Sequence, residues 1–167
     1  MRTISTRFRE AMNNPDTAEI LVVLLTIHHP DWAEPIRVSS DPTQLISETP
    51  EEYATISRNQ TFRYRPFSIT LPDDVPDRSP RTQIVIENIT RELIALVRSS
   101  PKRGVSMDIE LVLAATPSFV EVAFYGFDLE QANYNASTLT LDLSIDAMDL
   151  EPYPAGQFTP SYFPGLF

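Results

Sequence analysis

Residues 137–147 read STLTLDLSIDA and form the stretch of the chain that decides the fold. Every second residue from Leu139 to Ala147 is apolar, and the residues between them are threonine, serine or aspartate. Successive side chains of a β-strand point to opposite faces, so this alternation predicts a strand with one buried face and one face in water. We therefore expect the chain to be built on β-sheet.

Further strands are predicted on both sides of this one. Residues 18–29 (AEILVVLLTIHH) are rich in aliphatic and β-branched residues and contain no Gly or Pro, which indicates a strand covered on both faces. The other longer strands are expected at residues 61–71, 81–87, 105–115 and 119–127, with a brief one at residues 36–39. The rest of residues 30–50 is expected to be loop, because four prolines interrupt it.

Two short helices are also predicted. Ile4, Phe8 and Met12 recur at helical spacing, with Thr3 or Ser5 as the N-cap, and the Asn-Asn-Pro that follows should end the helix. The second pattern is NITRELIALVRSS (88–100), whose apolar residues again repeat at helical spacing before a proline and a glycine.

These elements define an expected architecture. We expect a mainly β protein with minor α content (α+β): an antiparallel β-sandwich or partly open barrel with one packed helix, a short N-terminal helix and an extended C-terminal arm. Residues 1–150 should form a single β-rich domain, and residues 151–167 should form a Pro- and aromatic-rich arm.

Composition excludes several kinds of function. The chain has no cysteine, so it can form no disulfide and carry out no thiolate chemistry. Its formal net charge of −10 argues against specific binding to nucleic acid, which requires clustered Lys and Arg. The longest apolar run, residues 20–27, is too short to span a bilayer, and the N-terminus lacks a signal-peptide pattern, so we expect no membrane insertion and synthesis in the cytoplasm.

Residues that could ligate a metal are few. His28 and His29 are adjacent on a predicted strand, so their side chains should point to opposite faces and cannot readily share one ion. Asp73, Asp74 and Asp77 lie in an acidic loop that lacks the Gly and the closing Glu of an EF-hand. We expect a strand end and a solvated turn at these two places, and neither a metal nor a cofactor.

Enzymatic activity is not expected either. The chain has no G-x-S-x-G elbow, its two histidines are in one dipeptide, and its four glycines cannot form a phosphate-binding loop. Arg63 and Arg65 alternate with aromatic residues in TFRYRPF (61–67), a pattern that can stack single-stranded bases. On so acidic a chain, cross-strand pairing with carboxylates is the better interpretation.

The arm PYPAGQFTPSYFPGLF (152–167) has no charged residue and carries five aromatic side chains. Burying five such side chains would contribute roughly 25 kcal/mol, and ordering the segment would cost about 16–32 kcal/mol. The two nearly cancel, so the arm should be ordered only in a well-shaped groove, either on its own domain or on a neighbouring subunit. Its expected anchors for assembly are Tyr153, Phe158, Tyr162, Phe163 and Phe167.

Three segments resemble one family over nearly the whole chain. They are LLTIHHPDWAEPIRVSSD (24–41), FRYRPFSITLPDDVPDRSPRTQIVIENITRELI (62–94) and EPYPAGQFTPSYFPGLF (151–167). The sequence resembles uncharacterised phage and prophage minor tail proteins, encoded near the tape-measure and tail-tip genes of long non-contractile tails. The terminal FTPSYFPGLF is the most specific part of the likeness.

The resemblance implies a structural component of the virion tail, a minor tail or distal-tail ring subunit that links the tail tube to the tail tip. Its partners would be further copies of itself in a ring, with six copies favoured over three, together with the tube, the tape measure and the tip hub. An acidic lumen would let DNA pass by repulsion.

Two other functions stay open at this stage. A receptor- or carbohydrate-binding module of the tail tip is the main alternative, since exposed aromatics such as Trp32 and Tyr53 could stack on sugar rings. A small cell-wall hydrolase is disfavoured, because the chain lacks the nucleophile and metal-ligand sets that such enzymes use.

Overall fold

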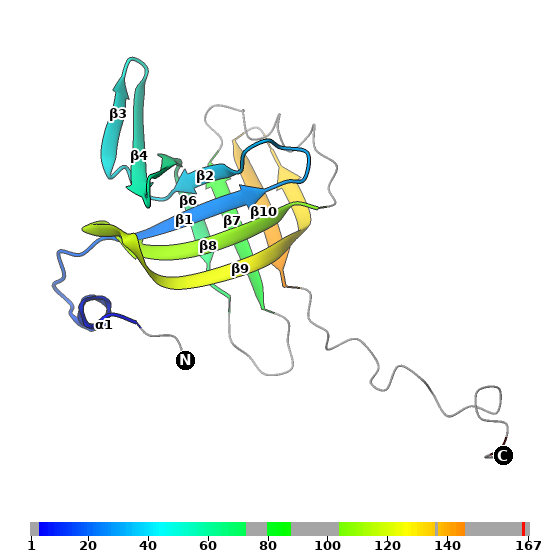
Figure 1. Ribbon diagram of the computed structural model, residues 1–167, viewed down its shortest axis with the longest axis horizontal. Coiled ribbons are helices and arrows are strands. Elements are labelled where there is room, and N and C mark those ends of the chain that lie inside the picture. The colour runs from blue at the N-terminus through cyan, green and yellow to red at the C-terminus, as the bar shows by residue number, and fades with distance from the viewer. Residues whose placement is uncertain (1–3, 73–79, 88–103, 136, 146–164, 166–167) are drawn as a thin grey trace.

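A computed structural model describes residues 4–72, 80–87, 104–135, 137–145 and 165 (Figure 1). The described part contains one helix, α1 (Thr6–Asn13), and ten strands. The strands are β1 (Leu21–His28), β2 (Ile36–Ser39), β3 (Gln44–Glu48), β4 (Glu51–Ser57), β5 (Gln60–Tyr64), β6 (Phe67–Thr70), β7 (Arg81–Glu87), β8 (Ser106–Leu113), β9 (Thr116–Tyr134) and β10 (Thr138–Ser144). None of the helical residues described makes a segment long and apolar enough to cross a membrane.

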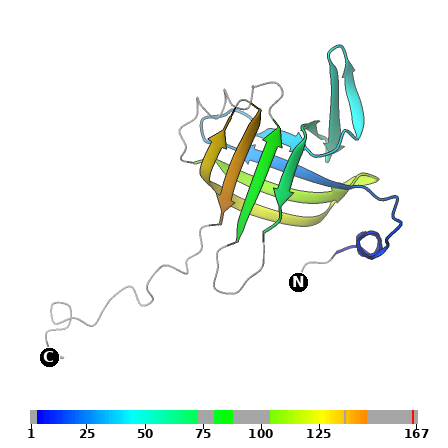
Figure 2. The ribbon, with the colours of Figure 1, turned by 180° about the vertical axis from the view of Figure 1, so that it is seen from behind.

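All ten strands belong to one sheet, in the order β3-β4-β5-β2-β1-β8-β9-β10-β7-β6. The sheet curls so that β1, β8 and β9 lie across β6, β7 and β10, while β3 and β6 remain separate edges (Figures 1 and 2). The predicted mainly β fold is confirmed, and a single curled sheet fits the partly open barrel better than a sandwich of two separate sheets. The expectation of purely antiparallel pairing is wrong at one place, since β2 and β5 pair in parallel.

The core fills the space inside this curl. β10 contributes Leu139, Leu141 and Leu143, each at most 3% exposed, as its alternating sequence predicts. The facing half of the curl contributes the buried residues Leu25, Ile27, Met107, Ile109, Leu111 and Phe127. A smaller buried cluster, which includes Phe62 of β5, covers the other face of β1, so this strand is covered on both faces, as its sequence predicts.

The strand predicted at residues 61–71 is wrong as one element, because it is two. β5 ends at Tyr64 and β6 begins at Phe67, with Pro66 between them, which has no N–H to donate to a ladder. The two strands take different neighbours: β5 pairs with β4 and β2, and β6 pairs with β7. The proline therefore marks the point where the chain crosses from one half of the curl to the other.

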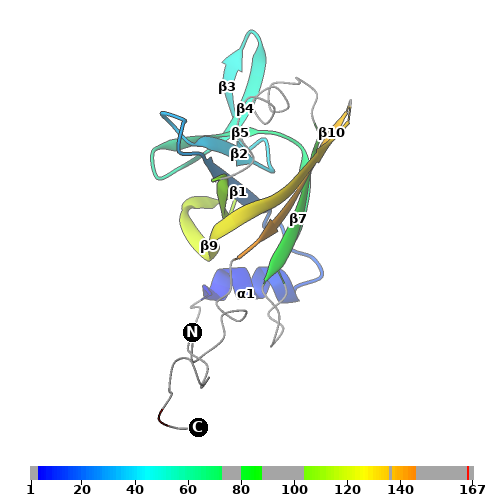
Figure 3. The ribbon, with the colours of Figure 1, turned by 90° about the vertical axis from the view of Figure 1, so that its right-hand side faces the viewer.

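Two strands were missed by the sequence patterns. β3 lies inside the stretch predicted to be loop, and β4 lies directly after it, where no strand was expected. Neither has a regular apolar alternation, and both are defined by pairing with each other and with β5. Together β3 and β4 form a hairpin that projects from the barrel, on the side away from α1 (Figure 3).

β9 is the long strand that joins the two halves of the curl. The sequence predicts only residues 119–127, whereas β9 runs over 19 residues and pairs first with β8 and then with β10. Several register shifts along it indicate bulges, which bend a strand and increase its twist. One bulge includes Gly126, whose φ of +73° is readily available only to glycine.

The N-terminal helix is confirmed, with Ser5 as its N-cap. The Ser5 hydroxyl accepts a hydrogen bond from the amide of Phe8 at 3.1 Å, and Phe8 is 5% exposed. The amide and hydroxyl of Ser5 donate to the carboxylate of Glu121 at 2.9 and 2.6 Å, which tethers α1 to β9. The second predicted helix, at residues 88–100, and the predicted domain boundary at residue 151 lie outside the described residues.

Candidate functional site

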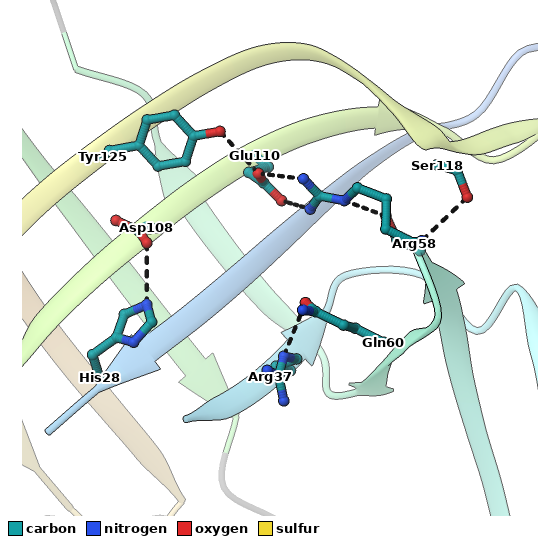
Figure 4. Close-up of polar contacts among 9 residues, drawn as sticks. His28, Arg37, Arg58, Gln60, Asp108, Glu110, Ser118 and Tyr125 are labelled. Carbon is teal, nitrogen blue, oxygen red and sulfur yellow. Dashed lines mark hydrogen bonds and ion pairs between the residues drawn. The ribbon is translucent and has the colours of Figure 1, made fainter. Parts of the chain in front are cut away.

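A polar cluster covers the outer face of β1, β8 and β9, on the opposite side of the sheet from the core (Figure 4). Alternation along β8 sends Met107, Ile109 and Leu111 inward, so Asp108 and Glu110 point outward. We call the set formed with these two carboxylates the outer-face cluster; it consists of His28, Arg58, Asp108, Glu110 and Tyr125. Three strands and one turn thus supply side chains to a single surface.

Arg58 reaches this surface from the turn between β4 and β5. Ser57 pairs with Gln60, so the turn consists of only two residues, Arg58 and Asn59, with φ of +49° and +61°. Two positive φ values are typical of a type I′ turn, whose twist matches that of the strands on either side. Asparagine tolerates this conformation well, whereas arginine adopts it at a cost, so other contacts must hold Arg58 there.

Those contacts come from β8 and from the start of β9. The guanidinium of Arg58 donates to both carboxylate oxygens of Glu110, with Nη1 3.1 Å from Oε1. The amide of Arg58 donates to the hydroxyl of Ser118 at 3.2 Å. The side chain of Glu110 is 7% exposed and that of Arg58 is 41% exposed, so a buried carboxylate is neutralised by a cation at the surface.

Tyr125 completes the surroundings of Glu110. Its hydroxyl donates to Oε1 of Glu110 at 3.1 Å from the neighbouring strand β9. Burial raises the pKa of Tyr125, and the adjacent charge of Glu110 raises it further. The hydrogen bond to Glu110 likewise raises the pKa of Arg58. Three donors on two side chains therefore satisfy one buried carboxylate.

Asp108 connects β1 to the bulge in β9. One carboxylate oxygen lies 3.1 Å from Nε2 of His28, and the other accepts a hydrogen bond from the amide of Gly126 at 3.0 Å. The bulge places Gly126 opposite Asp108, so this carboxylate fixes the irregularity that lets β9 bend. His28 and Asp108 remain partly open to solvent, with side chains 44% and 28% exposed.

The second histidine points the other way, as the sequence predicts. The side chain of His29 is 2% exposed, and its ring centroid lies 5.1 Å from that of Trp32. Nδ1 of His29 accepts a hydrogen bond from the amide of Asp31 at 3.1 Å. No group of metal-ligating side chains is found within the described ranges.

The two aromatics expected to be exposed platforms for sugars are only partly exposed. Trp32 is half-buried and packs against the core, where it also contacts His29. Tyr53 is also half-buried, and its hydroxyl donates to Glu51 at 2.5 Å. Both side chains are therefore partly exposed, and their use as platforms for sugars stays a prediction.

The root of the β3–β4 hairpin is held by buried hydroxyl groups. The hydroxyls of Ser39 and Thr55 lie 2.7 Å apart, and that of Thr43 lies 2.8 Å from that of Thr55. Ser39 and Thr55 are both fully buried. Such a network needs every member in place, so the hairpin leaves the barrel in a fixed direction.

Three apolar side chains of the hairpin strands remain in solvent. Leu45 and Ile46 on β3 are 43% and 39% exposed, and Ile56 on β4 is 41% exposed. β3 is also an edge strand, so one side of its backbone pairs with no other strand of the described chain. A fixed, apolar, open-edged hairpin is a surface suited to protein contacts.

A second apolar surface lies beneath α1. It is a pocket of about 160 Å³ whose apolar lining consists of Phe8, Ala11, Met12, Leu21 and Leu113. Met12 is 69% exposed, and the neighbouring Ile20 is 54% exposed. We call this surface the α1 pocket.

A polar groove of about 500 Å³ runs over the outer face of β6, β7, β9 and β10. Its lining includes Arg81, Gln83, Glu130 and Asp142. Nε2 of Gln83 donates to Asp142 at 2.7 Å. The groove offers planar polar side chains that can form hydrogen bonds with a hydroxyl-rich ligand.

The residues predicted as assembly anchors, Tyr153, Phe158, Tyr162, Phe163 and Phe167, lie outside the described residues, as do Asp73, Asp74 and Asp77. The arm therefore stays a prediction.

Sequence reasoning missed the outer-face cluster. A usable signal was Glu110 itself, a carboxylate inside the apolar run MDIELVLA (107–114), where a buried charge requires a partner. The partner, Arg58, lies 52 residues away in the chain and could not be identified from spacing.

Comparison with known proteins gives one match. A family model described as a domain of unknown function, DUF1833, matches residues 7–151, which span every strand of the sheet. A search of curated proteins finds no match. The chain therefore belongs to the DUF1833 family.

Proposed function

We propose that the chain is a structural subunit of a phage tail, a minor tail or distal-tail ring component that links the tail tube to the tail tip. The observation that carries the proposal is the projecting β3–β4 hairpin, which presents Leu45, Ile46 and Ile56 to solvent. The resemblance of the sequence to phage minor tail proteins supplies the biological setting.

The hairpin suits assembly for a physical reason. A two-stranded hairpin is marginally stable alone, so one that projects apolar side chains needs a firm root or a partner. The root is present, in the Ser39–Thr55 hydroxyl pair and in the ion pair of Arg58 with Glu110. The exposed side chains are then free to pack on a neighbouring subunit.

Ring formation is consistent with the rest of the molecule. The open sheet leaves β3 and β6 as two different edges, so contacts between copies need not be self-complementary. Contacts between two different surfaces generate rings when the rotation closes, and we propose six copies, with three as the other tail symmetry. The net charge of −10 suits a lumen through which DNA passes.

The experiment is tail assembly with a variant hairpin. Ile46→Glu places a charge in the proposed contact, while Ile46→Val keeps it apolar. We expect the first to reduce incorporation of the chain into tails at least tenfold and the second to leave it near the natural level, as measured by mass spectrometry of purified particles. Equal incorporation of the two variants, or absence of the natural chain from tails, would overturn the proposal.

The second candidate function is a carbohydrate- or receptor-binding module of the tail tip, and the polar groove beside Arg81 and Glu130 favours it. Binding of the full chain to a glycan array that is lost in Gln83→Ala would support this function. A ring subunit should bind no glycan.

A further inference from the structure

We propose that the α1 pocket receives an aromatic side chain from the C-terminal arm, residues 152–167, of a second copy of this chain. This inference rests on the proposed function and names the contact that would join neighbouring subunits. It is carried by the character of the pocket, by the place where β10 ends and by the composition of the arm.

The pocket is apolar and firmly built. Phe8, at its base, is 5% exposed, and the helix that covers it is tethered through Ser5 to Glu121. Its volume of about 160 Å³ matches a single aromatic side chain rather than a folded element. Met12 at its rim is 69% exposed, and a flexible thioether adapts well to an incoming ring.

Charge distinguishes the possible occupants from one another. Among the described residues that line the pocket, only Glu19 is charged, and it already accepts a hydrogen bond from Nε of Arg7 at 2.7 Å. The other projecting apolar segment, the β3–β4 hairpin, carries Glu48, Glu51 and Glu52 near its tip and would bring further negative charge to Glu19. The arm has no charged residue between Pro152 and Phe167.

The register of the sheet separates the pocket from the exit of the arm. Leu113, which lines the pocket, is the last residue of β8. Ser144, the last residue of β10, pairs with Asp128 of β9. Asp128 in turn pairs with Ser106, at the start of β8, so β10 ends beside the opposite end of β8 from the pocket. Seven residues of strand correspond to about 23 Å. In Figure 1, α1 lies near the left end of β8 and β9, whereas β10 ends farther to the right, away from α1.

Because the pocket and the end of β10 lie apart on one chain, a head-to-tail arrangement of copies can bring the arm of one copy to the pocket of the next. The 23 residues from Ile145 to Phe167 span up to about 75 Å when extended, which is ample for reaching a neighbour. When each copy gives its arm to the next and receives one from the previous copy, the contact repeats and closes into a ring.

Photo-crosslinking of the full-length chain tests this inference. Each of Tyr153, Phe158, Tyr162, Phe163 and Phe167 is replaced in turn by p-benzoylphenylalanine, and light and ¹⁵N-labelled chains are mixed before irradiation. We expect at least one position to crosslink to residues 8–21 of a chain carrying the other label, with Met12 as the main acceptor. Crosslinks confined to one chain, or none to the pocket from any position, would overturn the inference.

A matched pair of pocket variants sharpens the result. Met12→Glu should reduce the yield of crosslinks to residues 8–21 at least tenfold, while Met12→Leu should retain most of it. Leu71→Glu alters another exposed leucine, 41% exposed, which does not line the pocket, and should leave the yield unchanged. An unchanged yield in Met12→Glu would count against the pocket.

Failure of this inference can be told apart from failure of the proposed function. If the chain is present in purified tails but no inter-chain crosslink reaches the pocket, the inference fails alone. If the chain is absent from tails, the proposed function fails whatever the crosslinks show.

Discussion

Arg58 donates two hydrogen bonds to the carboxylate of Glu110, and the two residues differ sharply in burial. The carboxylate side chain is 7% exposed and the guanidinium side chain 41%. Arg58, whose φ of +49° is uncommon, is thus held against β8 by Glu110, a buried carboxylate that needs a positively charged partner. This pair and the hydrogen bond from the Arg58 amide to Ser118 together fix the position of the β4–β5 turn.

The difference in burial predicts an asymmetric mutational response. Arg58→Met leaves Glu110 buried with Tyr125 as its remaining donor, and we expect it to lower the free energy of unfolding by about 2–3 kcal/mol, since breaking a fully buried pair costs about 3–5 kcal/mol. Glu110→Gln should cost less, about 1–2 kcal/mol, because the freed guanidinium can turn to water. Urea denaturation measures both.

The double variant Arg58→Met with Glu110→Gln should be more stable than the sum of the two single costs implies, since no unpaired charge is left. Arg37→Met is the control: Arg37 donates to the neutral Gln60 near the surface, and its loss should change stability by less than about 1 kcal/mol. Equal costs for Arg58→Met and Glu110→Gln would contradict the asymmetry.

The turn conformation predicts a steric rank order at Asn59, whose φ is +61°. Asn59→Gly should change stability by no more than about 0.5 kcal/mol, while the β-branched Asn59→Val should lower it by about 1–2 kcal/mol. The midpoint of urea denaturation reports the order. A tolerated valine would show that the turn has relaxed away from type I′.

Tyr125 predicts a loss of stability in alkali. Its pKa is raised in the folded chain, so the unfolded chain releases this proton at lower pH and binds fewer protons than the folded chain above about pH 10. The contribution of Tyr125 to the free energy of unfolding is complete below about pH 10 and is lost as the pH rises through the pKa of the folded chain. The free energy of unfolding, measured by urea denaturation, should fall less steeply between pH 8 and 11 in Tyr125→Phe than in the natural chain. Parallel plots of this free energy against pH for the two proteins would refute the linkage.

The α1 cap predicts an unusual preference at Ser5. Aspartate is normally as good an N-cap as serine, but Ser5→Asp would place a second carboxylate against Glu121, which now accepts from the Ser5 hydroxyl. We expect Ser5→Asp to weaken the helix more than Ser5→Thr, which keeps both the cap and the donor. Hydrogen exchange of residues 6–13 measures the difference, and equal protection in the two variants would contradict it.

How far the sequence predicts this fold depends on what defines each strand. β10 and β7 were located because their own apolar residues alternate, and α1 because its cap and spacing are local. β4 was missed because its position is set by its partner β5 through the two-residue turn. The break at Pro66 was visible in the sequence, yet the patterns on either side of it look continuous.

The outer-face cluster shows the same limit for a site. Glu110 is a carboxylate within an apolar run, so the sequence predicts that it needs a positively charged partner. Which cation meets it depends on the curl of the sheet, which brings the β4–β5 turn over β8. The bulge at Gly126 and its contact with the Asp108 carboxylate cannot be predicted from the sequence for the same reason, since a bulge is a property of a pair of strands.

The lone parallel pair, β2 with β5, has a consequence for how relatives of this chain can vary. Because β5 returns alongside β2 in the same direction, the β3–β4 hairpin is an excursion of the chain between two strands that pair with each other. An insertion or deletion at the tip of that excursion disturbs no strand pair of the barrel. The hairpin is therefore the part of the molecule where evolution can change length and partner while the barrel stays the same.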